Sequence, residues 1–141
     1  MFKSLSLAMI LKNEEETLRG VLDSYKAIAD EIILGVDDSS NDKTYEIAKE
    51  YTEQVFYFKW EDDFSKARNL VLEKCTKDWC LFPDGHEYLR EGDGEKIKEI
   101  INNVPDNVKA VSLPIHFTEG ESDIQSFSFP RPILFRNHVG I

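Results

Sequence analysis

Short apolar runs alternate with segments of helical period along most of the chain. Four runs are rich in aliphatic and aromatic residues, and they are Leu5–Leu11, Glu31–Val36, Val55–Phe58 and Asp78–Phe82. Continuous rather than alternating hydrophobicity is typical of strands that are covered on both faces. The pattern therefore predicts four buried strands.

Apolar residues spaced three and four apart predict helices between and after these strands. The stripes are Leu18, Val21, Leu22, Tyr25 and Ile28; Tyr45, Ala48 and Tyr51; Phe64, Ala67, Val71 and Cys75; and Ile97, Ile100, Ile101 and Val104. Asn13, followed by three glutamates, is a candidate N-cap of the first helix, and Ser40 or Asn41 of the second. Alternating strands and helices predict an α/β fold, with a mostly parallel sheet and helices on both faces.

The pattern changes in the last third of the chain. Two apolar segments, Ala110–Phe117 and Phe127–Phe135, flank the polar loop Thr118–Gln125. This arrangement predicts an antiparallel C-terminal hairpin at the edge of the sheet. A length of 141 residues suits one domain with a real core. We therefore expect residues 1–141 to form a single domain of nucleotide-binding type.

Charge and composition exclude several classes of protein. With 27 acidic and 17 basic residues the net charge is −10, so we expect no surface for nucleic acid or anionic lipid. The stretch Met1–Leu11 has the wrong flanks for a signal peptide and is too short for a membrane span, which predicts a cytoplasmic protein. Cys75 and Cys80 lie in apolar surroundings without a metal-ligand spacing. They are predicted to be small buried thiols.

Acidic segments follow three of the predicted strands. They are Lys12–Glu15, Asp37–Asp42 and Asp84–Glu87. Each one alone is adequately explained as a helix cap or a solvated turn. In open α/β sheets, however, ligands bind at the carboxyl ends of the strands, and there the three segments would converge. Their mutual repulsion is costly unless backbone donors, solvent or a cation hold them, so together they favour a ligand site.

Two further features point to a ligand that carries phosphate, bound either directly or through a cation. Arg68 borders the apolar stripe of its predicted helix, where it either extends its charge to solvent or faces a nucleotide or phosphate. Asp84 and His86 flank Gly85 in a turn directly after an apolar strand. A carboxylate and an imidazole in this spacing would face one cation or its bound phosphate oxygens.

Several segments, in order and with matching spacing, resemble glycosyltransferase family 2. They are Leu5–Glu15, Asp30–Thr44, Trp60–Asn69 and Asp78–Asp84, with Arg131–Gly140 as a further segment of the same pattern. The resemblance implies the GT-A fold, a Rossmann-like nucleotide-binding sandwich. It also implies an inverting transfer of a sugar from a nucleotide donor, most simply a UDP-sugar, to a hydroxyl of a glycan, lipid or protein. A homo-oligomer is among the expected states.

The resemblance implies a role in binding the sugar nucleotide for a set of residues at the strand ends. They are Lys12, Asn13, Glu15, Asp37, Asp38, Arg68 and Asp84. Asp84 matches the first aspartate of the family's metal-binding Asp-x-Asp element, and His86 stands where the second is usual. Because imidazole suits manganese better than magnesium, the expected cofactor is a divalent metal, Mn²⁺ rather than Mg²⁺, held by Asp84 and His86. Glu87 is a further candidate for this task.

The catalytic base is the least defined part of the expectation. Glu119, Glu121 and Asp123 lie on the predicted hairpin loop and are candidates for accepting the acceptor's proton. Members of the family normally continue into an acceptor-binding region beyond the point where this sequence stops. We therefore expect a domain truncated before the full acceptor region.

Two alternatives remain beside the transferase. One is a non-catalytic module that binds a nucleotide sugar. The other is a phospho-receiver domain, suggested by the pair Asp37 and Asp38 after a strand. The receiver is disfavoured because the pair follows the second strand and no Lys-Pro closes Ala110–Phe117.

Overall fold

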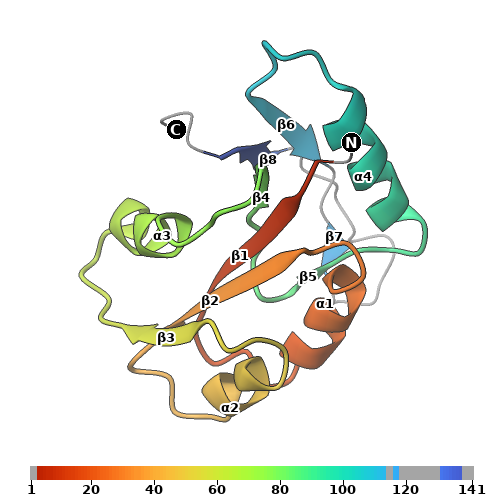
Figure 1. Ribbon diagram of the computed structural model, residues 1–141. Helices are drawn as coiled ribbons and strands as arrows, with labels where there is room; N and C mark the ends of the chain where they lie inside the picture. The colour runs from red at the N-terminus through yellow and green to blue at the C-terminus, as the bar shows by residue number, and fades with distance from the viewer. Residues whose placement is uncertain (1–2, 114–115, 118–130, 138–141) are drawn as a thin grey trace.

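The computed structural model describes residues 3–113, 116–117 and 131–137. Strands and helices alternate through the first part of the chain, as the apolar pattern predicts (Figure 1). The elements up to the fourth strand are β1 (Leu5–Leu11), α1 (Leu18–Tyr25), β2 (Glu31–Asp37), α2 (Thr44–Lys49), β3 (Val55–Phe58), α3 (Phe64–Leu72) and β4 (Trp79–Leu81). The later elements are β5 (Glu87–Tyr88), α4 (Asp93–Asn103), β6 (Ala110–Leu113), β7 (His116–Phe117) and β8 (Arg131–Arg136).

The main sheet is mixed, with the strand order β3-β2-β1-β4-β8-β6. β3, β2, β1 and β4 are parallel neighbours. β8 runs antiparallel to both β4 and β6 and lies between them. The prediction of a mostly parallel sheet that ends in an antiparallel C-terminal pair is therefore confirmed.

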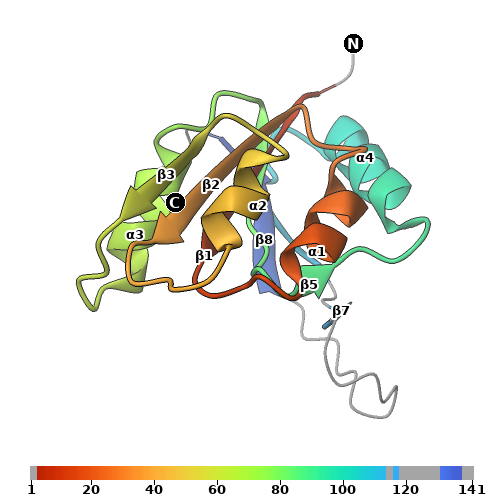
Figure 2. The same ribbon diagram turned by 90° about the horizontal axis from the view of Figure 1, so that it is seen from below.

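Helices cover both faces of the sheet, as predicted (Figures 1 and 2). Leu7 and Met9 of β1 are buried in a core with residues of α1, α2 and α4. Ala8, on the other side of the same strand, is buried with Val71 of α3. Cys75 and Cys80 are free and buried, which confirms the sequence prediction for the thiols.

The first two helices begin later than predicted. The N-cap of α1 is Thr17, not Asn13, and the N-cap of α2 is Lys43, not Ser40 or Asn41. Asn13 has a φ of 50° and its Oδ1 accepts a hydrogen bond from the Asn41 N–H at 2.9 Å. Its side chain therefore joins two loops instead of capping a helix.

The predicted strand Ala110–Phe117 is divided between two sheets. β6 belongs to the main sheet, whereas β7 pairs antiparallel with β5 in a small second sheet. This small sheet lies beside α1 (Figure 2). The predicted loop Thr118–Gln125 and the first residues of Phe127–Phe135 lie outside the described residues.

The described helices are short. The 11-residue α4 falls well below the roughly 20 apolar residues that span a bilayer. Among residues 3–113, 116–117 and 131–137, none of the helices combines the length and apolar content that a membrane crossing requires. The cytoplasmic location stays a prediction.

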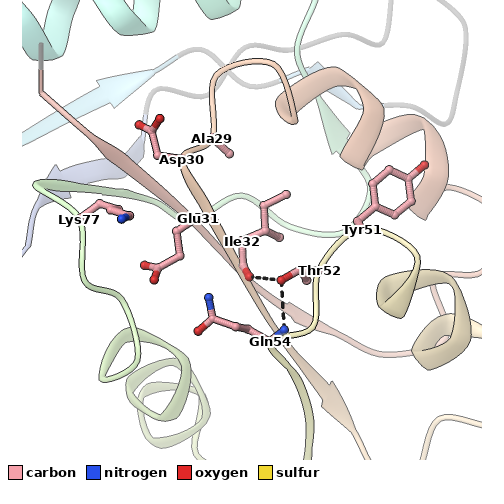
Figure 3. A pocket seen from close by; sticks show the side chains of 8 residues that line it. All are labelled: Ala29, Asp30, Glu31, Ile32, Tyr51, Thr52, Gln54 and Lys77. Atoms are coloured by element: carbon pink, nitrogen blue, oxygen red, sulfur yellow. Dashed lines mark hydrogen bonds between the residues drawn. The ribbon is translucent and has the colours of Figure 1, made fainter.

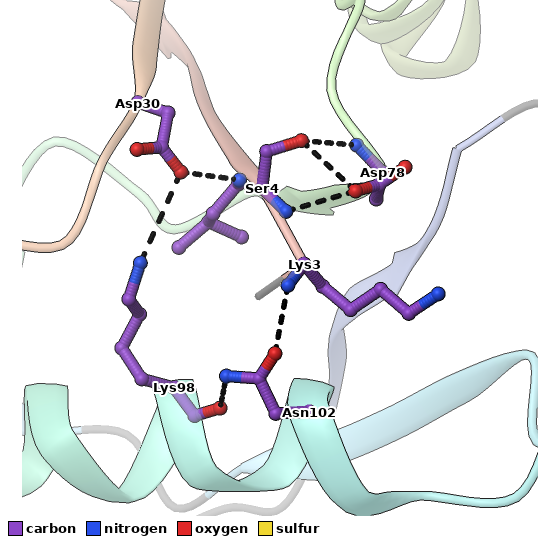
Figure 4. A network of polar contacts seen from close by, with 7 residues as sticks. Lys3, Ser4, Asp30, Asp78, Lys98 and Asn102 are labelled. Atoms are coloured by element: carbon purple, nitrogen blue, oxygen red, sulfur yellow. Dashed lines mark hydrogen bonds and ion pairs between the residues drawn. The ribbon is translucent and has the colours of Figure 1, made fainter. Parts of the chain in front are cut away.

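The parallel strands all begin on one side of the sheet and end on the opposite side. We call the edge where the parallel strands begin the amino edge, and the edge where they end the carboxyl edge. At the amino edge, Asp78 Oδ2 accepts hydrogen bonds from the N–H and the hydroxyl of Ser4 at 2.9 and 3.1 Å (Figure 4). Asp30 Oδ2 accepts the Leu5 N–H at 2.9 Å. These carboxylates fasten the starts of neighbouring strands to one another.

Candidate functional site

Three connections meet at the carboxyl edge. They are the first loop (residues 12–17, after β1), the second loop (residues 38–43, after β2) and the β4 turn (residues 82–86, before β5). Most of the predicted donor-binding residues belong to them. The sequence prediction that the acidic segments converge at one edge agrees with this topology because β1, β2 and β4 run parallel.

Hydrogen bonds join the first loop to the second. The Asn13 N–H donates to Ser40 Oγ at 3.3 Å, and the Asn41 N–H donates to Asn13 Oδ1 at 2.9 Å. The Glu14 N–H donates to the buried Thr44 Oγ1 at 2.8 Å. Backbone donors and side-chain acceptors alternate between the loops, so neither loop can shift without the other.

The acidic groups between these loops are held mainly by N–H donors. The Glu15 N–H donates to Asp42 Oδ2 at 3.1 Å, and the Lys43 N–H donates to Glu15 Oε1 at 2.8 Å. Burial raises the pKa of Asp42, but hydrogen bonds from the hydroxyl and N–H of Thr44 and from Glu15 outweigh it and hold the pKa below its ordinary value. The repulsion between these carboxylates is thus offset within the protein.

The β4 turn packs against the first loop. The Thr17 hydroxyl donates to the Gly85 carbonyl oxygen at 2.9 Å. A Cβ on Gly85 would lie 2.8 Å from Cγ and Cδ of Glu14, so any larger residue would require the Glu14 side chain to move. Asp84 and His86, on either side of Gly85, are half-buried. The first loop and the β4 turn therefore form one continuous surface.

Asp37 and Asp38 have different surroundings. Asp37 is 4% exposed, and its Oδ1 accepts hydrogen bonds from the N–H and hydroxyl of Ser39 at 2.9 and 2.7 Å. Asp38 is exposed, and its N–H donates to the Phe58 carbonyl oxygen at 2.8 Å. Asp37 thus fixes the turn that presents Asp38.

Arg68 lies on the α3 side of the same edge. Its guanidinium carbon is 5.0 Å from the ring centre of Phe82 and 5.3 Å from that of Phe135. Phe82 directly follows β4, so the two rings hold the cation near the end of that strand. Lys12, by contrast, is exposed on the first loop. The catalytic candidates Glu119, Glu121 and Asp123 lie outside the described residues.

The β4 turn has too few metal-binding side chains to hold a divalent cation by itself, so a bound molecule would have to supply further ligand atoms. Within the described residues, no group of three or more His, Cys, Asp and Glu side chains is arranged to hold a metal ion. Asp84 and His86 offer one carboxylate and one imidazole, which manganese accepts. Glu87 is buried, and its Oε1 accepts the Asp84 N–H at 2.6 Å. A metal here would take its remaining ligands from phosphate oxygens and water.

Pockets occur at both edges of the sheet. One of about 260 Å³ lies at the carboxyl edge and is lined by Asn13, Glu14, Glu15, Glu16, Thr17 and Asp42. Another of about 490 Å³ lies at the amino edge, where Asp30, Glu31, Gln54 and Lys77 line it with Ala29, Ile32, Tyr51 and Thr52 (Figure 3). Pocket size alone would therefore point to the edge without the converging loops.

Several residues of the site were missed in the sequence. Thr17 and Thr44 provide hydroxyls to the loop connections, and Glu14 packs on Gly85. The threonines do stand directly before or at the start of a helix, which is a usable signal for polar loop contacts. No sequence signal indicates the contact between Glu14 and Gly85, because those residues lie far apart in the chain.

Comparison with known proteins identifies the family to which the chain belongs. The family model described as Glycosyl transferase family 2 matches residues 6–138. A TPR repeat-containing protein of Synechococcus elongatus is 41% identical over 85 residues, which are 60% of this chain and 21% of that protein. The SPbeta prophage-derived glycosyltransferase SunS of Bacillus subtilis is 34% identical over 98 residues, covering 67% of this chain and 23% of SunS. The chain spans about a fifth to a third of these and similar curated relatives.

Solved structures show the same fold. The chain is similar to residues 1–349 of S. aureus TarS, with a TM-score of 0.59 and 19% identity over 95% of this chain and 47% of that one. It is also similar to glucosyl-3-phosphoglycerate synthase from Mycobacterium tuberculosis, with a TM-score of 0.52 and 22% identity over 61% of this chain and 34% of that one. At these identities the likeness concerns the fold alone.

Proposed function

Because the chain belongs to glycosyltransferase family 2, we propose that it binds a nucleoside diphosphate sugar at its carboxyl edge and transfers the sugar to an acceptor hydroxyl. Its architecture is the GT-A fold expected from the sequence. The observation that carries the proposal is the joining of the first loop, the second loop and the β4 turn into one polar surface beside Arg68.

The ligands of structural neighbours support a uridine nucleotide. S. aureus TarS was crystallised with UDP and with UDP-GlcNAc. The M. tuberculosis synthase was crystallised with Mg²⁺ and UDP, and also with Mn²⁺, UDP-glucose and phosphoglyceric acid. We propose that this chain takes a UDP-sugar with a divalent metal, Mn²⁺ in preference to Mg²⁺. Asp84 and His86 would hold the metal, which supplies positive charge to the leaving diphosphate.

The chain's own residues divide the binding task. Asp38 would contact the base or ribose, at a turn fixed by Asp37. Arg68 would supply a fixed cation for the nucleotide, because two phenylalanine rings hold its guanidinium. Lys12, Asn13 and Glu15 would line the donor pocket. Rigid loops of this kind reduce the cost of ordering the site on binding.

The transfer we propose inverts the anomeric centre. The acceptor oxygen forms a bond to the anomeric carbon while the bond from that carbon to the diphosphate oxygen breaks on the opposite side. The hydroxyl proton goes to a carboxylate, for which Glu119, Glu121 and Asp123 remain the candidates. The acceptor is a glycan, lipid or protein hydroxyl.

Calorimetry with UDP, with and without Mn²⁺, tests the donor site. We expect binding that Mn²⁺ strengthens, and no binding under either condition would overturn the proposal. Hydrolysis or transfer of the donor sugar by the 141-residue chain then tests catalysis. Binding without turnover would identify a nucleotide-sugar binding module, the alternative to a transferase.

A further inference from the structure

Glu87 is a buried carboxylate beside the proposed donor site. It is 1% exposed at the start of β5. Its Oε1 accepts the Asp84 N–H at 2.6 Å, and its own N–H donates to the Asp84 carbonyl oxygen at 3.1 Å. A buried carboxylate is costly unless hydrogen bonds compensate it, and a short bond from a backbone N–H is among the strong ones. The carboxylate thus closes the turn from within.

Burial alternates along this turn. Gly85 and Glu87 are buried, whereas Asp84 and His86 are half-buried. The buried pair faces the protein, where Thr17 donates to the Gly85 carbonyl oxygen and Glu14 packs on the Gly85 backbone. The turn is therefore held from inside by the Glu87 carboxylate and from the first loop by Thr17 and Glu14.

We infer that Glu87 is a positioning residue, which fixes the backbone of the β4 turn so that Asp84 and His86 meet the metal and diphosphate together. The inference rests on the proposed function. It also replaces the expectation that Glu87 ligates the metal, because its carboxylate lies in the interior and is bonded to the Asp84 backbone. Metal ligands must be held within about 0.5 Å of a productive geometry, so a loosened turn loses affinity even when both ligands are present.

Three variants distinguish the effect of the hydrogen bond from Glu87 to the Asp84 backbone from the effect of the Glu87 charge. Glu87→Gln keeps an oxygen acceptor at the same reach, Glu87→Asp keeps the charge but shortens the side chain, and Glu87→Ala removes both. Glu91→Ala, at an exposed position of the same segment, is the matched control. We expect about a tenfold loss of Mn²⁺-dependent UDP affinity in the Ala and Asp variants. The Gln variant should stay within about threefold of the wild type.

Amide hydrogen exchange gives a second readout that needs no nucleotide. The Asp84 N–H should be protected in the wild type and in Glu87→Gln and should exchange faster in Glu87→Ala. If Glu87→Ala does not fold, the Gln and Asp variants alone decide, since the inference requires them to differ.

The outcomes separate the two proposals. Wild-type protein that binds no UDP overturns the proposed function. Wild-type binding combined with unchanged affinity in folded Glu87→Ala overturns the role of Glu87 alone. Equal losses of UDP affinity in the Gln and Ala variants would also overturn it. They would show that the charge of Glu87 matters and that its hydrogen bond to the Asp84 backbone does not.

Discussion

The two edges of the sheet both concentrate acidic residues, but they use them differently. At the amino edge, both oxygens of Glu31 accept hydrogen bonds, from Ser6 and from the N–H and hydroxyl of Thr76, at 2.7 to 2.9 Å. At the carboxyl edge, Asp37 and Glu87 are used in the same internal way, whereas Asp38 is exposed and Asp84 half-buried. Exposure alone does not separate the two edges, because Asp30 and Asp78 at the amino edge are exposed as well. Both of them accept backbone N–H groups at the start of β1, so an acidic residue bonded in this way indicates a structural role.

This comparison predicts that substitutions at the carboxyl edge weaken binding and that those at the amino edge weaken folding. The largest effect should come from Asp84→Asn. Loss of a charged metal ligand should reduce Mn²⁺-dependent UDP affinity about 100-fold, or about 2.7 kcal/mol, with little change in stability. Calorimetry and urea unfolding measure the two quantities. Asp106→Asn, at an exposed position away from the site, is the control, and equal effects of both changes would mean that the metal site is misplaced.

Glu31→Ala should have the opposite effect. The substitution leaves Ser6 and Thr76 without their carboxylate partner, so we expect the free energy of unfolding to fall by about 2 kcal/mol. UDP affinity in the folded variant should not change. Urea unfolding measures the loss, with the exposed Glu53→Ala as control. A large loss of affinity would contradict the separation of the two edges.

Arg68→Lys should affect both properties modestly. Lysine keeps the charge but cannot reproduce the contact of a planar guanidinium with the rings of Phe82 and Phe135. We expect about a tenfold weaker UDP affinity and a stability loss of about 0.5 to 1 kcal/mol. Arg90→Lys, at an exposed position, makes the same exchange away from the rings and should change neither. Unchanged UDP binding by the Arg68 variant would reduce the residue to a core-packing role.

The smallest effect concerns Asp78 and depends on pH. A hydrogen bond from the Ser4 N–H lowers the pKa of Asp78, and burial raises it. With a further hydrogen bond from the Ser4 hydroxyl, the pKa stays below its ordinary value of 3.8. A lowered pKa means that the stabilisation is present above the unfolded-state pKa and is lost as pH falls through the folded-state value. Asp78→Asn should therefore cost about 1 kcal/mol at pH 7. The difference should shrink as the pH falls below 3.8 and vanish only below the lower folded-state pKa. Thermal unfolding across that pH range measures it, and a constant difference would rule out the carboxylate.

The strands and helices of this fold could largely be predicted because each buried element has its own apolar period. β5 and β7 could not, since a pair of two-residue strands carries no period. Helix starts were misplaced for a related reason. Asn13 has the chemistry of an N-cap, but its oxygen is used by Asn41 across the edge, a long-range competition that local sequence does not display.

For the candidate site, the sequence located the segments but not the division of tasks within them. Adjacent acids look alike in sequence, yet Asp37 is bonded to Ser39 and Asp38 is exposed. Glu87 is likewise buried and bonded to the Asp84 N–H, whereas Asp84 is half-buried. The role of each acid depends on whether its side chain points into the protein or toward solvent after the strand ends. The backbone there is irregular, so no sequence period predicts that direction.

The position of β8 has a consequence for synthesis of the chain. Its partners Trp79, Cys80 and Leu81 in β4 are translated long before residues 131–136. Until those residues leave the ribosome, β4 is an open strand edge with apolar side chains, a template for pairing with another chain. Although most of the proposed site follows β1, β2 and β4, protection of the open edge of β4 from aggregation therefore depends on the arrival of β8.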